Sequence, residues 1–173
     1  MGDTLITIIS IFLAAILMFI FPLMSVSERN DDIAQTVVQT ATSDFVDEVS
    51  ISGAIKASSY EAYQSKLFAT GNTYDIEIEV QHLDENPGKK ATSTSVDLVG
   101  ENVRYSTYTT EIINTMYSNP NREYDVKKGD NIVVTVKNTN KTIAQMLRTF
   151  FYKITGQGTY QVAASAASMV VNN

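Results

Sequence analysis

The chain opens on an apolar run that is set apart from everything after it. Residues 5–24 (LITIISIFLAAILMFIFPLM) contain no charged side chain. At about 1.5 Å per residue, a helix of this length covers the roughly 30 Å hydrocarbon layer of a bilayer. The pattern therefore predicts a transmembrane helix within residues 1–25, followed by a single domain in residues 26–173.

A cleaved secretory signal is the alternative for the same segment, because residues 25–27 are small enough to suit a signal peptidase. Signal peptides begin with basic residues, however, and have an apolar core of about 7–15 residues. Residues 1–3 contain no lysine or arginine, and the apolar run here is longer. We therefore expect the helix to be retained. The flanking charges, with Arg29 among acidic residues, give only a preference for a domain outside the cell.

Small and polar residues recur along one side of this predicted helix. Asp3, Thr7, Ser10 and Ala14 follow each other at steps of four, three and four positions, which places them on one narrow stripe. In lipid, such residues let two helix backbones approach closely, and hydroxyl groups can bond across the contact. The stripe predicts association with another helix. Chance spacing is the alternative, because serine and threonine are also tolerated in helices that stand alone.

Asp3 and Pro22 lie near the two ends of the apolar run, and the role of each has two interpretations. The Asp3 carboxylate lies at the membrane edge, where it could sit among lipid headgroups or meet the N-terminal amine of a neighbouring chain. Pro22 either marks the end of the span or kinks a helix that continues. Continuation is favoured by the apolar residues that recur at helical steps further on: Ile33, Val37, Val38, Ala41, Phe45 and Val49. We expect an amphipathic helix over residues 30–50, joined to the span and packed on the domain.

The remainder of the chain alternates between helical and extended patterns. Short helices are predicted after Ser58, which would form a capping box with Glu61, and at residues 107–117 and 142–154. Strands are predicted at residues 74–83, 124–126, 131–138 and 160–171, where apolar and polar positions alternate or small apolar residues prevail. The predicted fold class is α+β, with a long N-terminal helix on a small, mostly antiparallel sheet with short helices.

Composition narrows the possible partners. The chain has 13 lysines and arginines against 19 aspartates and glutamates, a net charge of −6, which disfavours binding to nucleic acid. It has no cysteine, so neither disulfides nor thiolate chemistry is available. Stability must therefore come from packing.

A search for reactive groups leaves few candidates. His82 is the only histidine, and at the end of a predicted strand we expect it to have a plain surface or edge role. The adjacent acidic residues on the amphipathic helix diverge and are explained by solvation. No spacing suits a calcium loop or a phosphate-binding loop. We therefore expect no catalytic residues, no metal site and no cofactor, and the chain is not predicted to be an enzyme.

Residues 3–50 together resemble type IV pilins, including the Tad-type and pseudopilin-like proteins of Gram-positive bacteria. The resemblance is carried by the early carboxylate Asp3, the uninterrupted apolar span, Pro22 at its far end, the amphipathic extension and the small sheet domain that follows. Residues after 50 resemble the family in general architecture only. Family members carry a longer basic leader, whereas two residues precede Asp3 here, and their carboxylate is usually a glutamate.

This resemblance implies a structural subunit of a pilus-like surface filament or of a related secretion or DNA-uptake apparatus. Membrane lipid would hold the helix before assembly, and copies of the same chain would surround it afterwards. The implied assembly residues are Asp3, Thr7, Ser10, Ala14 and Pro22, with Asp3 neutralising a neighbour's terminal amine. Pilus assembly machinery and a prepilin peptidase are the other implied partners. The alternative is a single-pass, membrane-anchored extracellular binding module that does not polymerise.

Overall fold

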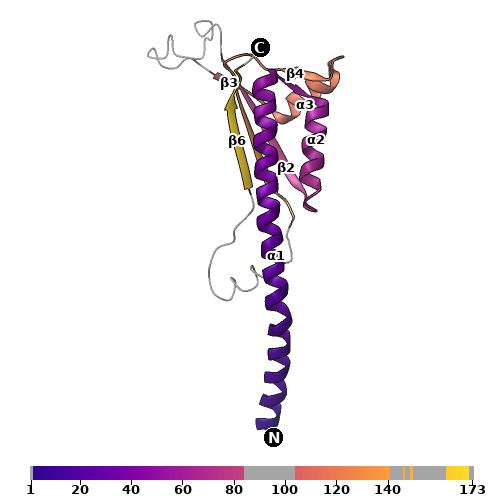
Figure 1. Ribbon diagram of the computed structural model, residues 1–173, viewed down its shortest axis with the longest axis vertical. Helices are drawn as coiled ribbons and strands as arrows, with labels where there is room; N and C mark the ends of the chain where they lie inside the picture. The colour runs from indigo at the N-terminus through magenta and orange to yellow at the C-terminus, as the bar shows by residue number, and fades with distance from the viewer. Residues whose placement is uncertain (1, 84–103, 141–145, 147–148, 150–162, 172–173) are drawn as a thin grey trace, which may run out of the picture. The chain divides into compact units, whose positions relative to one another are not determined.

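The computed structural model describes residues 2–83, 104–140, 146, 149 and 163–171 (Figure 1). The chain forms two compact units, residues 1–36 with 140–162 and residues 37–139 with 163–173. The described elements are a long N-terminal helix, short helices and antiparallel sheets. The α+β class predicted from the sequence is therefore confirmed.

The first helix, α1 (Gly2–Ser52), is 51 residues long and runs through Pro22 without a break. The predicted continuation of the apolar helix into an amphipathic one is therefore confirmed. A proline ring removes one helical N–H donor, and here the helix tolerates that loss. The helix ends at Gly53, which has a φ of 71° and donates its N–H to the carbonyl of Val49 at 2.9 Å. A glycine adopts this left-handed conformation without strain, so it suits the helix end.

Two short helices follow. The helix α2 (Ala57–Phe68) buries Ala57, Tyr60, Tyr63 and Leu67. The predicted Ser58 capping box is wrong: the helix begins two residues earlier than predicted, and its N-cap, Lys56, makes no side-chain capping bond. The helix α3 (Thr109–Ser118) buries Ile112 and Met116.

Four strands form the main sheet, in the order β3-β2-β5-β6 with antiparallel pairing throughout. Their bounds are β2 (Tyr74–Leu83), β3 (Arg104–Tyr108), β5 (Asn131–Asn138) and β6 (Ala163–Met169). A separate two-stranded sheet pairs β1 (Ala54–Lys56) with β4 (Glu123–Asp125). The turn at residues 127–130 therefore connects strands of two different sheets.

The core of the second unit lies between the main sheet and the helices. From the sheet it takes Ile78 and Val80 of β2 and Ile132, Val134 and Val136 of β5, all at most 1% exposed. The C-terminal part of α1 contributes Val38, Ala41, Phe45, Val46 and Val49. Phe45 stacks on Tyr63 of α2 with ring centroids 4.7 Å apart and planes at 5°. Within this unit, α1 thus packs beside α2 (Figure 1).

Several sequence expectations require correction. Ile33 and Val37 were expected on the buried face of α1 but are 56% and 40% exposed, whereas the next residue in each case, Ala34 and Val38, is buried. Residues 107 and 108 belong to β3 and not to the helix that was predicted to begin there. The strands β1 and β3 were not predicted. Of the helix predicted at residues 142–154, all but residues 146 and 149 lie outside the described part of the chain, as do the first three residues of the last strand.

Candidate functional site

The predicted assembly residues lie in the first part of α1. Asp3, Thr7, Ser10 and Ala14 are all exposed, and one continuous helix carries them at the spacing that makes a stripe. The Thr7 hydroxyl donates to the backbone carbonyl of Asp3 at 2.7 Å. This bond within the helix leaves the oxygen of Thr7 free to accept a bond from another chain.

The surroundings of this stripe are strongly apolar. Side chains between Leu5 and Leu23 stand out from the helix with exposed fractions that reach 76% at Phe19. The helix is long and apolar enough to cross a membrane, and none of its most apolar stretch is buried inside the protein. Exposed apolar surface of this extent needs a covering of lipid or protein. Pro22 is exposed as well.

A polar cluster around His82 lies at the opposite end of the second unit's sheet from the start of β2. The His82 side chain is only 12% exposed. Its Nδ1 lies 2.7 Å from Oδ2 of Asp130, and its Nε2 lies 2.8 Å from the hydroxyl of Tyr124. The plain surface or edge role expected for His82 is therefore wrong, because both ring nitrogens are engaged in a largely buried network.

Asp130 is the centre of this cluster. It is 2% exposed, and it accepts backbone N–H bonds from Leu83 and Lys127, each at 3.0 Å. Burial raises the pKa of the Tyr124 phenol, so this hydroxyl keeps its proton and can donate to Nε2 of His82. A carboxylate oxygen can only accept, so Nδ1 of His82 donates to Asp130. Each polar side-chain atom of Asp130, His82 and Tyr124 thus has a hydrogen-bond partner.

The arrangement of these three side chains ties separate segments together. Tyr124 belongs to β4, His82 to β2, and Asp130 to the turn before β5. The backbone of the same turn bonds to the end of the chain, since Gly129 N–H donates to Val170 and Val170 N–H donates to Asp130. A buried network with all its groups satisfied fixes one arrangement of the chain. We assign it a structural role.

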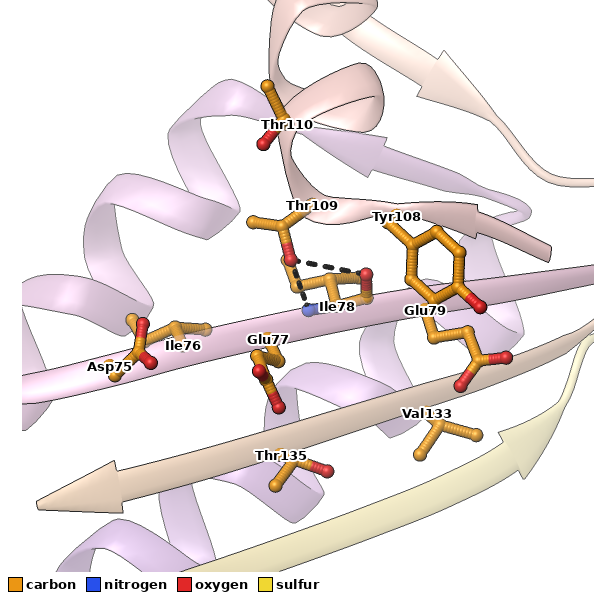
Figure 2. Close-up of a pocket in the computed structure, with 10 residues that line it drawn as sticks. All are labelled: Asp75, Ile76, Glu77, Ile78, Glu79, Tyr108, Thr109, Thr110, Val133 and Thr135. Atoms are coloured by element: carbon orange, nitrogen blue, oxygen red, sulfur yellow. Dashed lines mark hydrogen bonds between the residues drawn. The ribbon is translucent and has the colours of Figure 1, made fainter.

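A shallow groove of about 470 Å³ lies on the outer face of the sheet beside β2 (Figure 2). Its floor carries three carboxylates from alternate positions of β2, Asp75, Glu77 and Glu79. Val133 and Thr135 of the neighbouring β5 extend the floor on one side. Tyr108, 63% exposed, stands at the end of β3 beside Glu79.

Thr109 closes the upper side of this groove. Its hydroxyl accepts a bond from the backbone N–H of Ile78 at 2.7 Å and donates to the carbonyl of Ile78 at 3.2 Å, as the dashed lines of Figure 2 show. At Thr109 the chain passes from β3 into α3. The Thr109 hydroxyl makes the two bonds to Ile78 that the backbone of a further β3 residue would otherwise make. No local sequence pattern predicts the groove, because it depends on where β3 ends.

Metal binding has little support in the described residues. Among them, no three or more histidine, aspartate or glutamate side chains are grouped so as to hold an ion. The carboxylates of the groove floor are instead engaged in part by neighbours: Lys137 donates to Glu77 at 3.0 Å, and Ser106 donates to Glu79 at 2.6 Å.

Comparisons with known proteins give no family for this chain. No model of a protein family, no curated protein and no solved structure matches it.

Proposed function

We propose that the chain is a structural subunit of a type IV pilus-like, Tad-like surface filament or of a related secretion or DNA-uptake apparatus. The observation that carries this proposal is the uninterrupted helix α1, whose first part is apolar and exposed while its last part is built into the core of a domain. Only the first, apolar part of such a helix needs to be covered by other molecules, because its last part is already buried in the domain. Lipid supplies that covering before assembly, and copies of the same helix supply it afterwards.

The stripe gives this association a preferred side. Asp3, Thr7, Ser10 and Ala14 are the small or polar positions along which two backbones can approach. Asp3 would neutralise the terminal amine of a neighbouring subunit, and Pro22 would correspond to the helix proline of the pilins that the sequence resembles. The domain lies outside the cell and acts without catalysis, and the assembly machinery and a prepilin peptidase are its transient partners.

The test replaces the small residues of the stripe by large ones. In the double variant Ser10→Leu/Ala14→Leu, we expect membrane insertion to persist and filament assembly to fail, because leucine keeps the helices apart. The matched control is Ala15→Leu, which adds the same side chain about 100° around the helix from Ala14. The measurement is cryo-electron microscopy of surface material sheared from cells that express each variant.

Two results would count against the proposal. Wild-type protein found solely as monomers in the membrane fraction would favour the alternative, an anchored extracellular binding module that does not polymerise. Filaments of normal yield from the double variant would show that the stripe is not the contact surface. The intact mass of the purified subunit reports in the same preparation whether Met1 and Gly2 have been removed.

A further inference from the structure

One edge of β2 is left open over half of its length. The strand β3 pairs with β2 only from Glu79 to Leu83, whereas β5 pairs with β2 from Tyr74 to Gln81. Residues 74–78 of β2 therefore have a strand on one side, and in the described part of the chain no strand pairs with them on the other. Open strand edges present backbone groups that can pair with another chain.

The direction of each backbone group follows from the alternation along the strand. Ile78 directs its N–H and C=O away from β5, since both bond to Thr109. Backbone groups alternate sides with a period of two, so Ile76 and Tyr74 direct theirs to the same open edge. Within residues 2–83, 104–140 and 163–171, no group bonds to these backbone atoms on that side. Two donors and two acceptors are thus presented in a row.

The charge around this edge selects what can bind there. Asp75, Glu77 and Glu79 share the outer face of β2, and among the described residues Lys137 supplies the one ammonium group bonded to them. In the described part of the structure, the Asp75 carboxylate forms no ion pair or hydrogen bond. The groove is therefore negative overall. It favours a basic ligand and repels an acidic one.

We propose that the open edge of β2 binds an extended, basic segment of a partner protein, which adds to the main sheet as a strand beside residues 74–78. This is the β-strand-addition mode, in which backbone bonds supply affinity and alternate side chains supply specificity. Lysines or arginines at every second position of the segment face the carboxylates of Asp75, Glu77 and Glu79. The intervening positions lie beside Ile76 on the other face. Thr109 limits the added strand at one end.

The proposal does not depend on the assembly of α1, because every residue of the groove belongs to the second unit. A test can therefore use the full chain in micelles of a zwitterionic detergent. The probe is a fluorescein-labelled peptide of sequence KVKVKV, followed by fluorescence anisotropy. Hydrogen exchange of the Ile76 amide, measured by NMR, reports strand addition directly. We expect saturable binding and at least tenfold slower exchange of that amide in the complex.

Two altered peptides separate strand addition from simple attraction of charges. The peptide EVEVEV keeps the extended pattern and reverses the charge, and we expect it not to bind. A KVKVKV peptide that is N-methylated at its valines keeps the charge and loses the donors on one edge, and a second version methylated at its lysines loses the other edge. One of these two should bind at least tenfold more weakly than the parent peptide.

Two proline variants test the edge on the protein side. Ile76→Pro removes a donor that faces the open edge and leaves the ladder to β5 intact, so peptide affinity should fall at least tenfold. The control is Ala167→Pro on β6, whose N–H faces away from β5 at the opposite edge of the same sheet, because the alternation places it with Met169. We expect this control to bind as wild type does. Glu77→Gln/Glu79→Gln should weaken binding without touching the backbone.

Equal binding of both methylated peptides and the parent would overturn the proposal in favour of charge attraction alone. So would wild-type affinity in Ile76→Pro, or an Ile76 amide whose exchange is unchanged in the complex. Because the methylated peptides are tested on the wild-type chain, a folding defect of a variant cannot hide these outcomes.

Discussion

At the scale of single residues, Asp130 shows how much one buried carboxylate can organise. It accepts bonds from the side chain of His82 and from the backbones of Leu83 and Lys127 while 2% exposed. Burying a carboxylate costs free energy unless hydrogen-bond donors occupy its oxygens. The partners come from the end of one strand, β2, and from the turn before β5, so the carboxylate holds those two segments together.

Replacing Asp130 by alanine should destabilise the second unit strongly. The change leaves His82 and two partly buried backbone N–H groups without an acceptor, at a cost of about 2–4 kcal/mol in the free energy of unfolding. The control is Glu77→Ala, which breaks an ion pair whose two side chains are 51% and 58% exposed. It should cost at most about 1 kcal/mol. Urea denaturation followed by near-ultraviolet circular dichroism of the tyrosines measures both, and equal midpoints would contradict the role given to Asp130.

The phenol of Tyr63 gives a prediction about alkaline pH. Thr42 uses its hydrogen on the carbonyl of Val38, so Tyr63 donates to the Thr42 oxygen at 2.9 Å. Burial raises the pKa of Tyr63 from 10.0 to about 12. Between these two pH values the unfolded chain loses a proton that the folded chain keeps, so stability falls as pH rises through this window. The contribution is fully present below pH 10.

The measurement compares the pH dependence of unfolding in wild type and Tyr63→Phe. In this window the Tyr63 phenol changes the free energy of unfolding by up to about −1.4 kcal/mol per pH unit. The variant lacks this contribution. At neutral pH the variant should lose about 1 kcal/mol with its hydrogen bond. Parallel stability curves above pH 10 would show that the Tyr63 phenol does not carry this dependence.

At the scale of elements, alternation along a strand separates core from surface. Ile132, Val134 and Val136 of β5 face the helices and are buried, while Val133 and Thr135 face outward. The same alternation governs β2, whose outward positions are acidic. Strands of this kind are the part of the fold that the sequence predicts best.

A pair of alanine variants tests this assignment of faces. Ile132→Ala removes a side chain that is 0% exposed and should cost about 2–5 kcal/mol, through lost burial and the cavity left behind. Thr135→Ala, three residues later on the outer face, should stay within about 0.5 kcal/mol of wild type. Thermal unfolding of both variants decides the matter, and similar losses would mean that the register of β5 is different.

Elements without a strong period were harder to predict. The three residues of β1 are too few to show one, and β3 has the sequence RYSTY, in which apolar and polar positions do not alternate by burial. Both strands exist because a partner strand supplies their hydrogen bonds. Ile33 and Val37 fit the helical period as well as Ala34 and Val38 do. Only the packing of α1 on the domain selects between the two neighbouring faces.

At the scale of the whole molecule, the His82 cluster and the groove depend on which strands pair and in which register. No local sequence pattern reveals either. His82 and Asp130 are 48 positions apart and meet because Gln81 pairs with Asn131 across β2 and β5. Strands were predicted at residues 74–83 and 131–138, but no local pattern gives the register in which they pair. The groove likewise arises where β3 stops short of the start of β2. By contrast, the stripe on α1 needed only the helical period, because all of its residues lie on one element.

The position of β6 has a consequence for biosynthesis. This strand completes the sheet, and Val170 and Val171 beyond it bond to Asp130 and to Ser50 at the end of α1. A ribosome synthesises these residues after every other described helix and strand. The main sheet can therefore close only after residues 163–169 have been made, whereas the apolar part of α1 is made first. Until β6 pairs, the edge of β5 that it covers is open to other strands.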